Sequence, residues 1–432
     1  MGTTDGYGVH PWGMFRSDAQ NTGMSPYSAE HNDGSQRWTY DVGANLTGSP
    51  VVDSNGTVFI TTDEGYIHSI SEEGVLNWNH QISWGIPSGI ALAADGTVYV
   101  ATTGIGIYAY TPKGALLWSD TLPVVAWVDP PTVSVDGSVI FVRWDGWVYR
   151  YSPDGTWGGW KSLEGRGTPA IMDNGSILMA IRGTTHLKWF GTDGDVWRVL
   201  ETTGVCTGAT AIDYDEEMDT VVVLSTHDNG GLVETFTLSG VYLYQVDFPS
   251  PAVGFPAIGP NGMIHVLCEN GLLYAINSVG ELEWTVDCGN ASATSPVTDT
   301  HGTVFVANGD GELLAVSPSG EVLWRFTAGG DITSSLAIDR DGIVYFGADD
   351  GLLYAVGREA SSPIPWWVYL SIFVVLLFGT LGIVTSSLYF RKVHQRGRRE
   401  KEDARGDEEA IVEMVEESTW DAPAERDGGE GE

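Results

Sequence analysis

A segment of about 40 residues recurs along most of the chain, and it constrains the fold more than any other feature. Residues 49–78 and 295–324 match in register, with Ser-Pro-Val at the start, Gly-Thr-Val-Phe seven residues later and tryptophan at the end. The separations between successive terminal tryptophans are 40, 40, 42, 37, 87 and 40 residues, and the gap of 87 holds one degenerate repeat ending at Tyr244. Such a period is typical of propeller blades. The tryptophans are Trp38, Trp78, Trp118, Trp160, Trp197, Trp284 and Trp324.

Each repeat predicts a β-hairpin with a tight glycine turn. Asn-Gly and Asp-Gly pairs at these turns favour type I′ geometry, in which both central residues take positive φ. Eight such hairpins occur, with turns at Gly56, Gly96, Gly137, Gly175, about Asp219, Gly262, Gly302 and Gly342. The tryptophan strand after each unit is expected to begin the next sheet.

The first tryptophan strand, Arg37–Val42, has no hairpin before it, and the last hairpin, ending at Leu352–Val356, has no tryptophan strand after it. Pairing the two leaves no open sheet edge. We therefore predict an all-β, eight-bladed β-propeller closed by its own beginning, with seven blades as the alternative.

This repeat resembles the pyrroloquinoline-quinone-like propeller family, over roughly residues 12–358. Residues 12–26 are similar to the segment that often precedes the first blade in that family. The family includes the bacterial outer-membrane assembly propeller, which is a non-enzymatic scaffold, and the quinoprotein alcohol dehydrogenases. The resemblance implies the fold, whereas one fold hosts unrelated functions.

Residues 366–390 form a run of 25 residues without a charged side chain. A helix of this length spans about 37 Å at about 1.5 Å per residue, which exceeds the ~30 Å hydrocarbon core of a bilayer. Basic residues follow the run at Arg391, Lys392, Arg396, Arg398, Arg399, Lys401 and Arg405, whereas only Arg358 precedes it. We predict a single-pass transmembrane helix in contact with membrane lipid, with a cytoplasmic C-terminus and an extracytoplasmic propeller.

Five regions follow from these features. They are a lead-in segment (1–35), the propeller (36–358), a linker (359–365), the transmembrane helix (366–390) and a tail (391–432) that is first basic and then acidic. The tail cannot bury a core, so we expect it to be disordered and cytoplasmic. The first thirty residues hold no basic stretch followed by an apolar one. Either the export signal lies upstream of Met1 or the single helix directs export alone, and we favour a start upstream of Met1.

Charge and cysteine content exclude several classes of function. The formal net charge is −36, from 57 acidic and 21 basic residues, which argues against a nucleic-acid partner. The three cysteines, Cys206, Cys268 and Cys288, cannot make a disulfide framework and lack zinc-site spacing. Acidic turns such as 339–342 superficially match calcium loops, but turn preference explains them better.

An enzyme would be a quinoprotein dehydrogenase with pyrroloquinoline quinone and calcium as cofactors. In that branch the resemblance implies a quinone stacked between a tryptophan and a disulfide of adjacent cysteines. The nearest two cysteines here are Cys268 and Cys288, which are twenty residues apart. We therefore expect no catalytic residue, no metal site and no cofactor, and keep the dehydrogenase as an alternative.

The best interpretation is a membrane-anchored, non-enzymatic propeller that binds envelope or surface proteins. The repeat tryptophans are predicted to be structural and to pack between neighbouring sheets. Additional aromatic residues in the third and fourth repeats are candidate ligand-binding residues, and stacked rings there would bind a glycan or a partner's aromatic anchor. These candidates are Trp144, Trp147 and Trp157.

Overall fold

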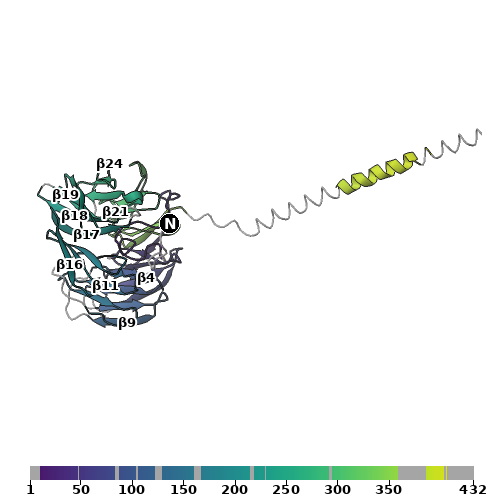
Figure 1. Ribbon diagram of the computed structural model, residues 1–432. Helices are drawn as coiled ribbons and strands as arrows, with labels where there is room; N and C mark the ends of the chain where they lie inside the picture. Colours follow the sequence, from purple (N-terminus) through teal and green to yellow (C-terminus); the bar gives the residue numbers. More distant parts are fainter. Residues whose placement is uncertain are drawn as a thin grey trace, which may run out of the picture. The chain divides into compact units, whose positions relative to one another are not determined.

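The repeats fold into eight antiparallel β-sheets. The computed structural model describes residues 10–358, except 47, 83–86, 104–105, 122–128, 160–166, 215–217, 229 and 291–293, together with 386–402 and 405. Seven sheets have four described strands each, and the sheet of the third repeat has three. Figure 1 shows the sheets following one another in sequence order. The prediction of an all-β, eight-bladed propeller is confirmed.

Each blade is a simple meander, numbered here by its order in the chain. Blade 1 contains β2 (Val51–Val52), β3 (Val58–Thr61), β4 (Tyr66–Ile70) and β5 (Leu76–Gln81). Blade 2 contains β6 (Pro87–Leu92), β7 (Val98–Thr102), β8 (Gly106–Tyr110) and β9 (Leu116–Thr121). Blade 3 contains β10 (Thr132–Val133), β11 (Val139–Val142) and β12 (Val148–Tyr151). Blade 4 contains β13 (Ala170–Ile171), β14 (Ile177–Ile181), β15 (His186–Phe190) and β16 (Val196–Glu201). Blade 5 contains β17 (Val205–Asp213), β18 (Thr220–His227), β19 (Gly230–Thr237) and β20 (Tyr242–Phe248). Blade 6 contains β21 (Ala252–Ile258), the 3₁₀ turn η1 (Pro260–Gly262), β22 (Ile264–Cys268), β23 (Leu272–Ile276) and β24 (Leu282–Asp287). Blade 7 contains β25 (Val297–Thr298), β26 (Val304–Ala307), β27 (Glu312–Val316) and β28 (Val322–Thr327). Blade 8 contains β29 (Ala337–Ile338), β30 (Val344–Gly347), β31 (Leu352–Val356) and β1 (Gln36–Asp41).

The tryptophan strand is the outermost strand of its own blade. Trp78 lies on β5 and pairs with Ser69 of β4, and Trp38 lies on β1 and pairs with Ala355 of β31. The expectation that this strand begins the next sheet is therefore wrong, because the strand continues the meander of the hairpin that precedes it. The predicted closure is confirmed, since β1 completes the sheet of β29, β30 and β31.

The hairpin turns differ from the predicted type I′ geometry. Gly56 has φ 78°, whereas Asn55 is not among the described non-glycine residues with positive φ. Asp53 instead organises the turn, because its carboxylate accepts hydrogen bonds from the backbone N–H groups of Asn55 and Thr57, each at 2.8 Å. Such side-chain capping suits a type I turn that ends in a glycine. Among the hairpin turns that the structure describes, only Asn261-Gly262 has positive φ at both residues, 61° and 68°.

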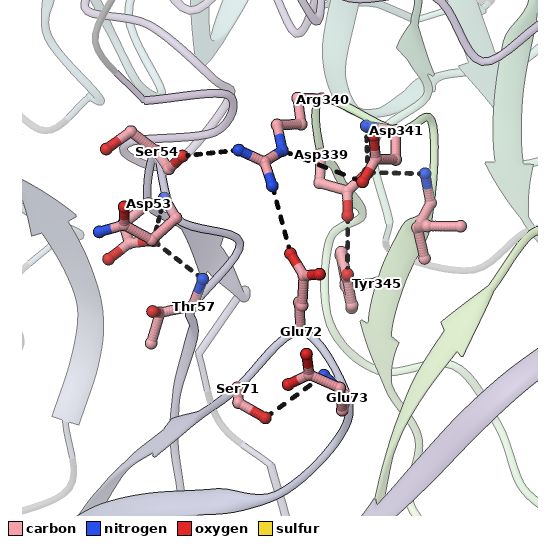
Figure 2. Close-up of polar contacts among 12 residues, drawn as sticks. Asp53, Ser54, Thr57, Ser71, Glu72, Glu73, Asp339, Arg340, Asp341 and Tyr345 are labelled. Carbon is pink, nitrogen blue, oxygen red and sulfur yellow. Dashed lines mark hydrogen bonds and ion pairs between the residues drawn. The ribbon is translucent and has the colours of Figure 1, made fainter. Parts of the chain in front are cut away.

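The seam between the last and first blades carries polar contacts as well as packing. Arg340 of blade 8 donates hydrogen bonds to the Ser54 carbonyl at 3.3 Å and to the Glu72 carboxylate at 3.4 Å, both in blade 1 (Figure 2). Asp339 lies beside it, buried, and accepts hydrogen bonds from two backbone N–H groups of its own turn and from the Tyr345 hydroxyl. The buried carboxyl group of the acidic turn 339–342 thus stabilises the backbone of its own turn.

The second and third strands of each blade form the core. β3, β11, β26 and β30 are buried along their whole length, because both faces pack against neighbouring sheets. This explains their nearly continuous hydrophobic sequence. In the outermost strands, exposed residues alternate with partly buried ones, as in β28, because one face of these strands meets solvent.

Contacts divide the chain into Met1–Glu359 and Ala360–Glu432. In the second unit, residues 386–402 are helical, which corrects the predicted disorder over 391–402, while the rest of the predicted tail, apart from 405, lies outside the described residues. Helix-favouring arginine, lysine and glutamate, with opposite charges four residues apart at Arg396/Glu400 and Arg398/Glu402, account for the difference.

The predicted transmembrane helix, 366–390, lies outside the described residues except for 386–390. No helix within the described part of the chain is both long and apolar enough to cross a membrane.

Candidate functional site

The meander gives the propeller two distinct faces around its axis. The innermost strand of every blade begins on one face, named here the start face, and ends at the glycine turn on the other, named the end face. Because the four strands alternate in direction, the loop between the second and third strands lies on the start face. The loop between the third and fourth strands lies on the end face.

The lead-in segment, residues 10–35, runs around the axis at the end face. Its carbonyl groups accept hydrogen bonds from the innermost strands of six blades. These strands would otherwise leave free N–H groups along the axis, since an edge strand has no partner on one side. The pairs are Trp12 with Val52, Gly13 with Leu92, Ala19 with Ile171, Gln20 with Ile212, Thr22 with Ile258 and Gly23 with Thr298, at 2.7–2.9 Å.

Arg16 crosses the axis within this segment. Its guanidinium is fully buried and donates hydrogen bonds to the carbonyls of Pro256 and Pro296, at 2.5 and 2.6 Å, in blades 6 and 7. Gly13, three residues earlier, contacts blade 2 on the other side. Burial lowers the pKa of Arg16 to about 9, opposed by the negative charge of Asp18. The segment therefore joins opposite blades and occupies the axis from the end face.

A cavity of about 600 Å³ opens on the start face, over blades 3 to 6. Phe15 of the lead-in segment contributes to its lining and meets Phe255 edge-on, with ring centroids 5.3 Å apart. Charged side chains of both signs line it as well: Asp129, Arg182 and Glu269. The cavity thus combines aromatic surface with carboxylates and one guanidinium.

Blade 5, the degenerate repeat, contributes much of the cavity lining. β17, β18 and β19 have 9, 8 and 8 residues, whereas the equivalent strands of blade 1 have 2, 4 and 5. Residues 205–209 at the beginning of β17, together with Thr226 near the end of β18, line the cavity. The extra length of this repeat therefore serves the start face.

The three predicted ligand-binding aromatics do not share one surface. Trp144 lines the cavity, is 38% exposed, and donates a hydrogen bond from its indole N–H to Asp129 at 3.3 Å. Trp147 lies in the same start-face loop, is 40% exposed and does not line the cavity. Trp157 is 60% exposed in the loop after β12, on the end face. The structure therefore separates Trp157 from Trp144.

Five repeat tryptophans pack against the next unit around the ring. Trp284 of blade 6 donates its indole N–H to the Pro318 carbonyl of blade 7 at 2.8 Å, and its ring lies on Gly320, where a β-carbon would be 2.8 Å away. Tyr244 is placed in the same way, on Gly280 of blade 6. For Trp324 the lead-in segment at Asn32–Gly34 supplies the corresponding turn. The other members are Trp38, Trp78 and Trp118.

Trp197 does not occupy this position, and the prediction is one residue out of register. Arg198 pairs with Trp189 across β15 and β16, as Trp284 pairs with Ala275 in blade 6. Arg198 lies where a β-carbon on Gly240 would meet it, and its guanidinium is 6.0 Å from the buried Trp189 ring. In blade 4 the buried indole is therefore that of Trp189 on β15, whereas the side chain of Trp197 on β16 is 52% exposed. Trp160 lies outside the described residues.

Phe15, Asp129, Arg182, Phe255 and Glu269 were not singled out by sequence reasoning. They come from the lead-in segment and from the start-face ends of three different blades. The repeat pattern assigns a residue to its blade, but it does not show which residues of other blades lie beside it across the axis. The one sequence signal for this site was the length of the degenerate repeat.

The cavity does not fit the quinone site that the resemblance implies for dehydrogenases. Cys206 lies on its wall, while Cys268 and Cys288 belong to blade 6 and its exit, and all three are free and buried. Burial raises the pKa of each thiol. Within the described ranges, no group of three or more histidine, cysteine or acidic side chains is placed to hold a metal ion.

Comparison with known proteins supports the fold and part of the repeat. Residues 269–366 match the family model described as outer membrane protein assembly factor BamB. A search of curated protein sequences gave no significant match.

Solved structures share the propeller at low sequence identity. BamB from Moraxella catarrhalis is 15% identical, with 75% of this chain and 100% of that one covered and a TM-score of 0.59. A europium-containing methanol dehydrogenase is 12% identical, with 81% and 98% covered and a TM-score of 0.63. Quinohemoprotein alcohol dehydrogenase from Comamonas testosteroni is 13% identical, with 82% and 81% covered and a TM-score of 0.59. At these identities the likeness concerns the fold alone.

Proposed function

We propose that this propeller is a non-enzymatic scaffold that binds other proteins of the cell envelope. The observation that carries the proposal is the match of residues 269–366 to the family described as an outer membrane assembly factor. The architecture suits such a role, because a closed ring of sheets holds broad loop-bearing faces on a rigid frame.

Membrane anchoring through residues 366–390 and an extracytoplasmic location belong to the same proposal. Their support is the 25-residue uncharged run and the basic residues that follow it. Protease treatment of intact cells should then cleave the propeller and spare the tail. Release of the full chain from membranes by alkaline carbonate would contradict the anchor.

Crosslinking followed by pull-down from native membranes tests the scaffold. The expected result is a reproducible set of envelope proteins, captured by the full chain through its propeller. A full-length variant with a destabilised propeller, such as Gly320→Val, serves as the matched control, because Gly320 has φ 84° and contacts Trp284. Recovery of the same set by this unfolded variant, or of no protein by the native chain, would exclude the scaffold.

A dehydrogenase remains the second candidate, since methanol and alcohol dehydrogenases share the fold. Addition of pyrroloquinoline quinone and calcium to the purified chain should then produce quinone absorbance and dye-linked oxidation of alcohols. The missing cysteine pair argues for the opposite outcome, with no saturable quinone binding.

A further inference from the structure

We propose that the start-face cavity binds a neutral carbohydrate chain. This inference is independent of the scaffold role, because it concerns one cavity and a small ligand. A volume of about 600 Å³ lies within the range of about 300–1,000 Å³ typical of ligand sites. Three aromatic rings and three charged side chains on its lining define the chemistry of the ligand.

The aromatic rings offer flat surfaces with restricted orientations. Phe15 and Phe255 fix each other by edge-to-face packing at 5.3 Å, and Trp144 is held by its hydrogen bond to Asp129. A pyranose ring has an apolar C–H face that packs on an aromatic face, while its hydroxyl edge faces outward. Pre-oriented rings lower the entropy that binding would otherwise cost.

The charges favour a neutral ligand over an ionic one. Asp129 and Glu269 repel an anion, as does the excess of acidic residues, 43 against 13 basic, in residues 1–359. Arg182 in the same lining offsets part of the attraction of these two carboxylates for a cation. A polyol satisfies all three groups, because its hydroxyls donate hydrogen bonds to carboxylates and accept them from a guanidinium.

The cavity wall favours an oligosaccharide over a single sugar. Lining residues come from four successive blades, and the lengthened strands of blade 5 stand beside the opening. A cavity lined by aromatic rings from the lead-in segment, blade 3 and blade 6 suits a chain of sugars. Phe15 lies nearer the axis, where it also contributes to a second, smaller hollow, whereas Trp144 comes from the loop between β11 and β12.

A printed array of neutral, acidic and basic glycans, probed with the full chain in detergent, tests the proposal. Calorimetry then measures the affinity for the best neutral glycan, with the trimers of N-acetylglucosamine and glucosamine as a neutral and cationic pair. Trp144→Ala should weaken binding about tenfold, the effect of losing about 1.4 kcal/mol of stacking. Trp157→Ala, in the same blade but on the end face, should leave the affinity within about twofold.

Further outcomes decide the ligand class. Arg182→Ala and Glu269→Gln should each weaken binding, with unchanged thermal unfolding midpoints. Affinity for the neutral glycan should stay constant between about 0.1 and 1 M NaCl, because no charges pair. The proposal is overturned by an array without neutral signals, by tighter binding of charged sugars, or by equal losses in Trp144→Ala and Trp157→Ala.

Discussion

At the residue scale, five boundaries between blades depend on one aromatic ring resting on one glycine, and Trp324 makes the same contact with Gly34 of the lead-in segment. Each ring donates its hydrogen bond to the neighbouring blade or, for Trp324, to the lead-in segment, so these residues join parts that share no strand. A side chain at the glycine would displace the ring. Local sequence therefore specifies contacts between blades as well as strands within them.

Replacement of Trp284 by alanine should lower the free energy of unfolding by about 2–4 kcal/mol. The change removes a half-buried indole and leaves the Pro318 carbonyl without its donor. Trp157→Ala, which removes an exposed ring, should change it by no more than about 0.5 kcal/mol. Guanidinium denaturation measures both, and equal effects would contradict the structural role.

Two buried titratable groups should oppose each other between about pH 4 and 6. Burial lowers the pKa of His265 to about 4, so this histidine stays neutral when folded and gains a proton on unfolding; its contribution to stability grows as pH rises. Burial raises the pKa of Asp339 to about 6, so this carboxyl stays protonated when folded and loses its proton on unfolding; its contribution falls as pH rises.

Single variants should reveal the two contributions. Asp339→Asn should make the free energy of unfolding rise more steeply with pH over this window, and His265→Phe should make it rise less steeply or fall. Phenylalanine suits the site, because Phe59 and Phe305 pack on tryptophan at the equivalent positions. Denaturation at several pH values provides the test, with Asp341→Asn as the exposed control. Identical slopes in all variants would contradict the assignment.

At the element scale, the lead-in segment acts as a shared partner for the innermost strands. Its backbone hydrogen bonds reach six blades, and its buried Trp12 and Met14 add to two of the hydrophobic cores. A segment outside the repeat thus completes the repeat's free edges. The degenerate blade 5 is the other irregular element, and its longer strands line the cavity.

Deletion of residues 1–25 should lower the unfolding midpoint by about 10 °C or more. Six hydrogen bonds worth about 1 kcal/mol each are lost, along with the burial of two large side chains. A synthetic peptide of residues 10–35 should restore part of the loss when added in trans. Calorimetry of the deleted chain with this peptide, and with a scrambled one, provides the measurement. A deletion without effect would show that the segment is dispensable.

At the scale of the whole molecule, charge dominates the surface. Residues 1–359 hold 43 acidic and 13 basic residues, and exposed carboxylates occur on most blades. Such an excess destabilises a compact state by self-repulsion. Salt relieves it, since the Debye length falls from about 30 Å at 0.01 M to about 8 Å at 0.15 M.

The unfolding midpoint should therefore rise between about 0.01 and 0.15 M NaCl. A variant with Glu64→Gln, Glu73→Gln and Glu321→Gln, three exposed positions, should show a smaller rise. Differential scanning calorimetry at several salt concentrations measures the two slopes. A midpoint that falls with salt, or equal slopes, would contradict a stability limited by repulsion.

The sequence by itself determined the blades, their number, the glycine turns and the closure between β1 and β31. These features follow from short-range patterns: alternating hydrophobic residues, turn residues and a tryptophan at a fixed distance from its hairpin. The same patterns failed in blade 4, where Arg198, and not the predicted Trp197, covers the glycine of the next blade. Both side chains are large enough to cover a glycine, so the sequence does not show which of the two does so.

Only the tertiary structure decided what meets at the axis. Phe15 and Phe255 are 240 residues apart in sequence, and Asp129, Arg182 and Glu269 come from three blades, so no local pattern relates them. Their proximity results from the closing of the ring, which sets the distances between blades. The cavity is therefore a property of the closed propeller and of no single repeat.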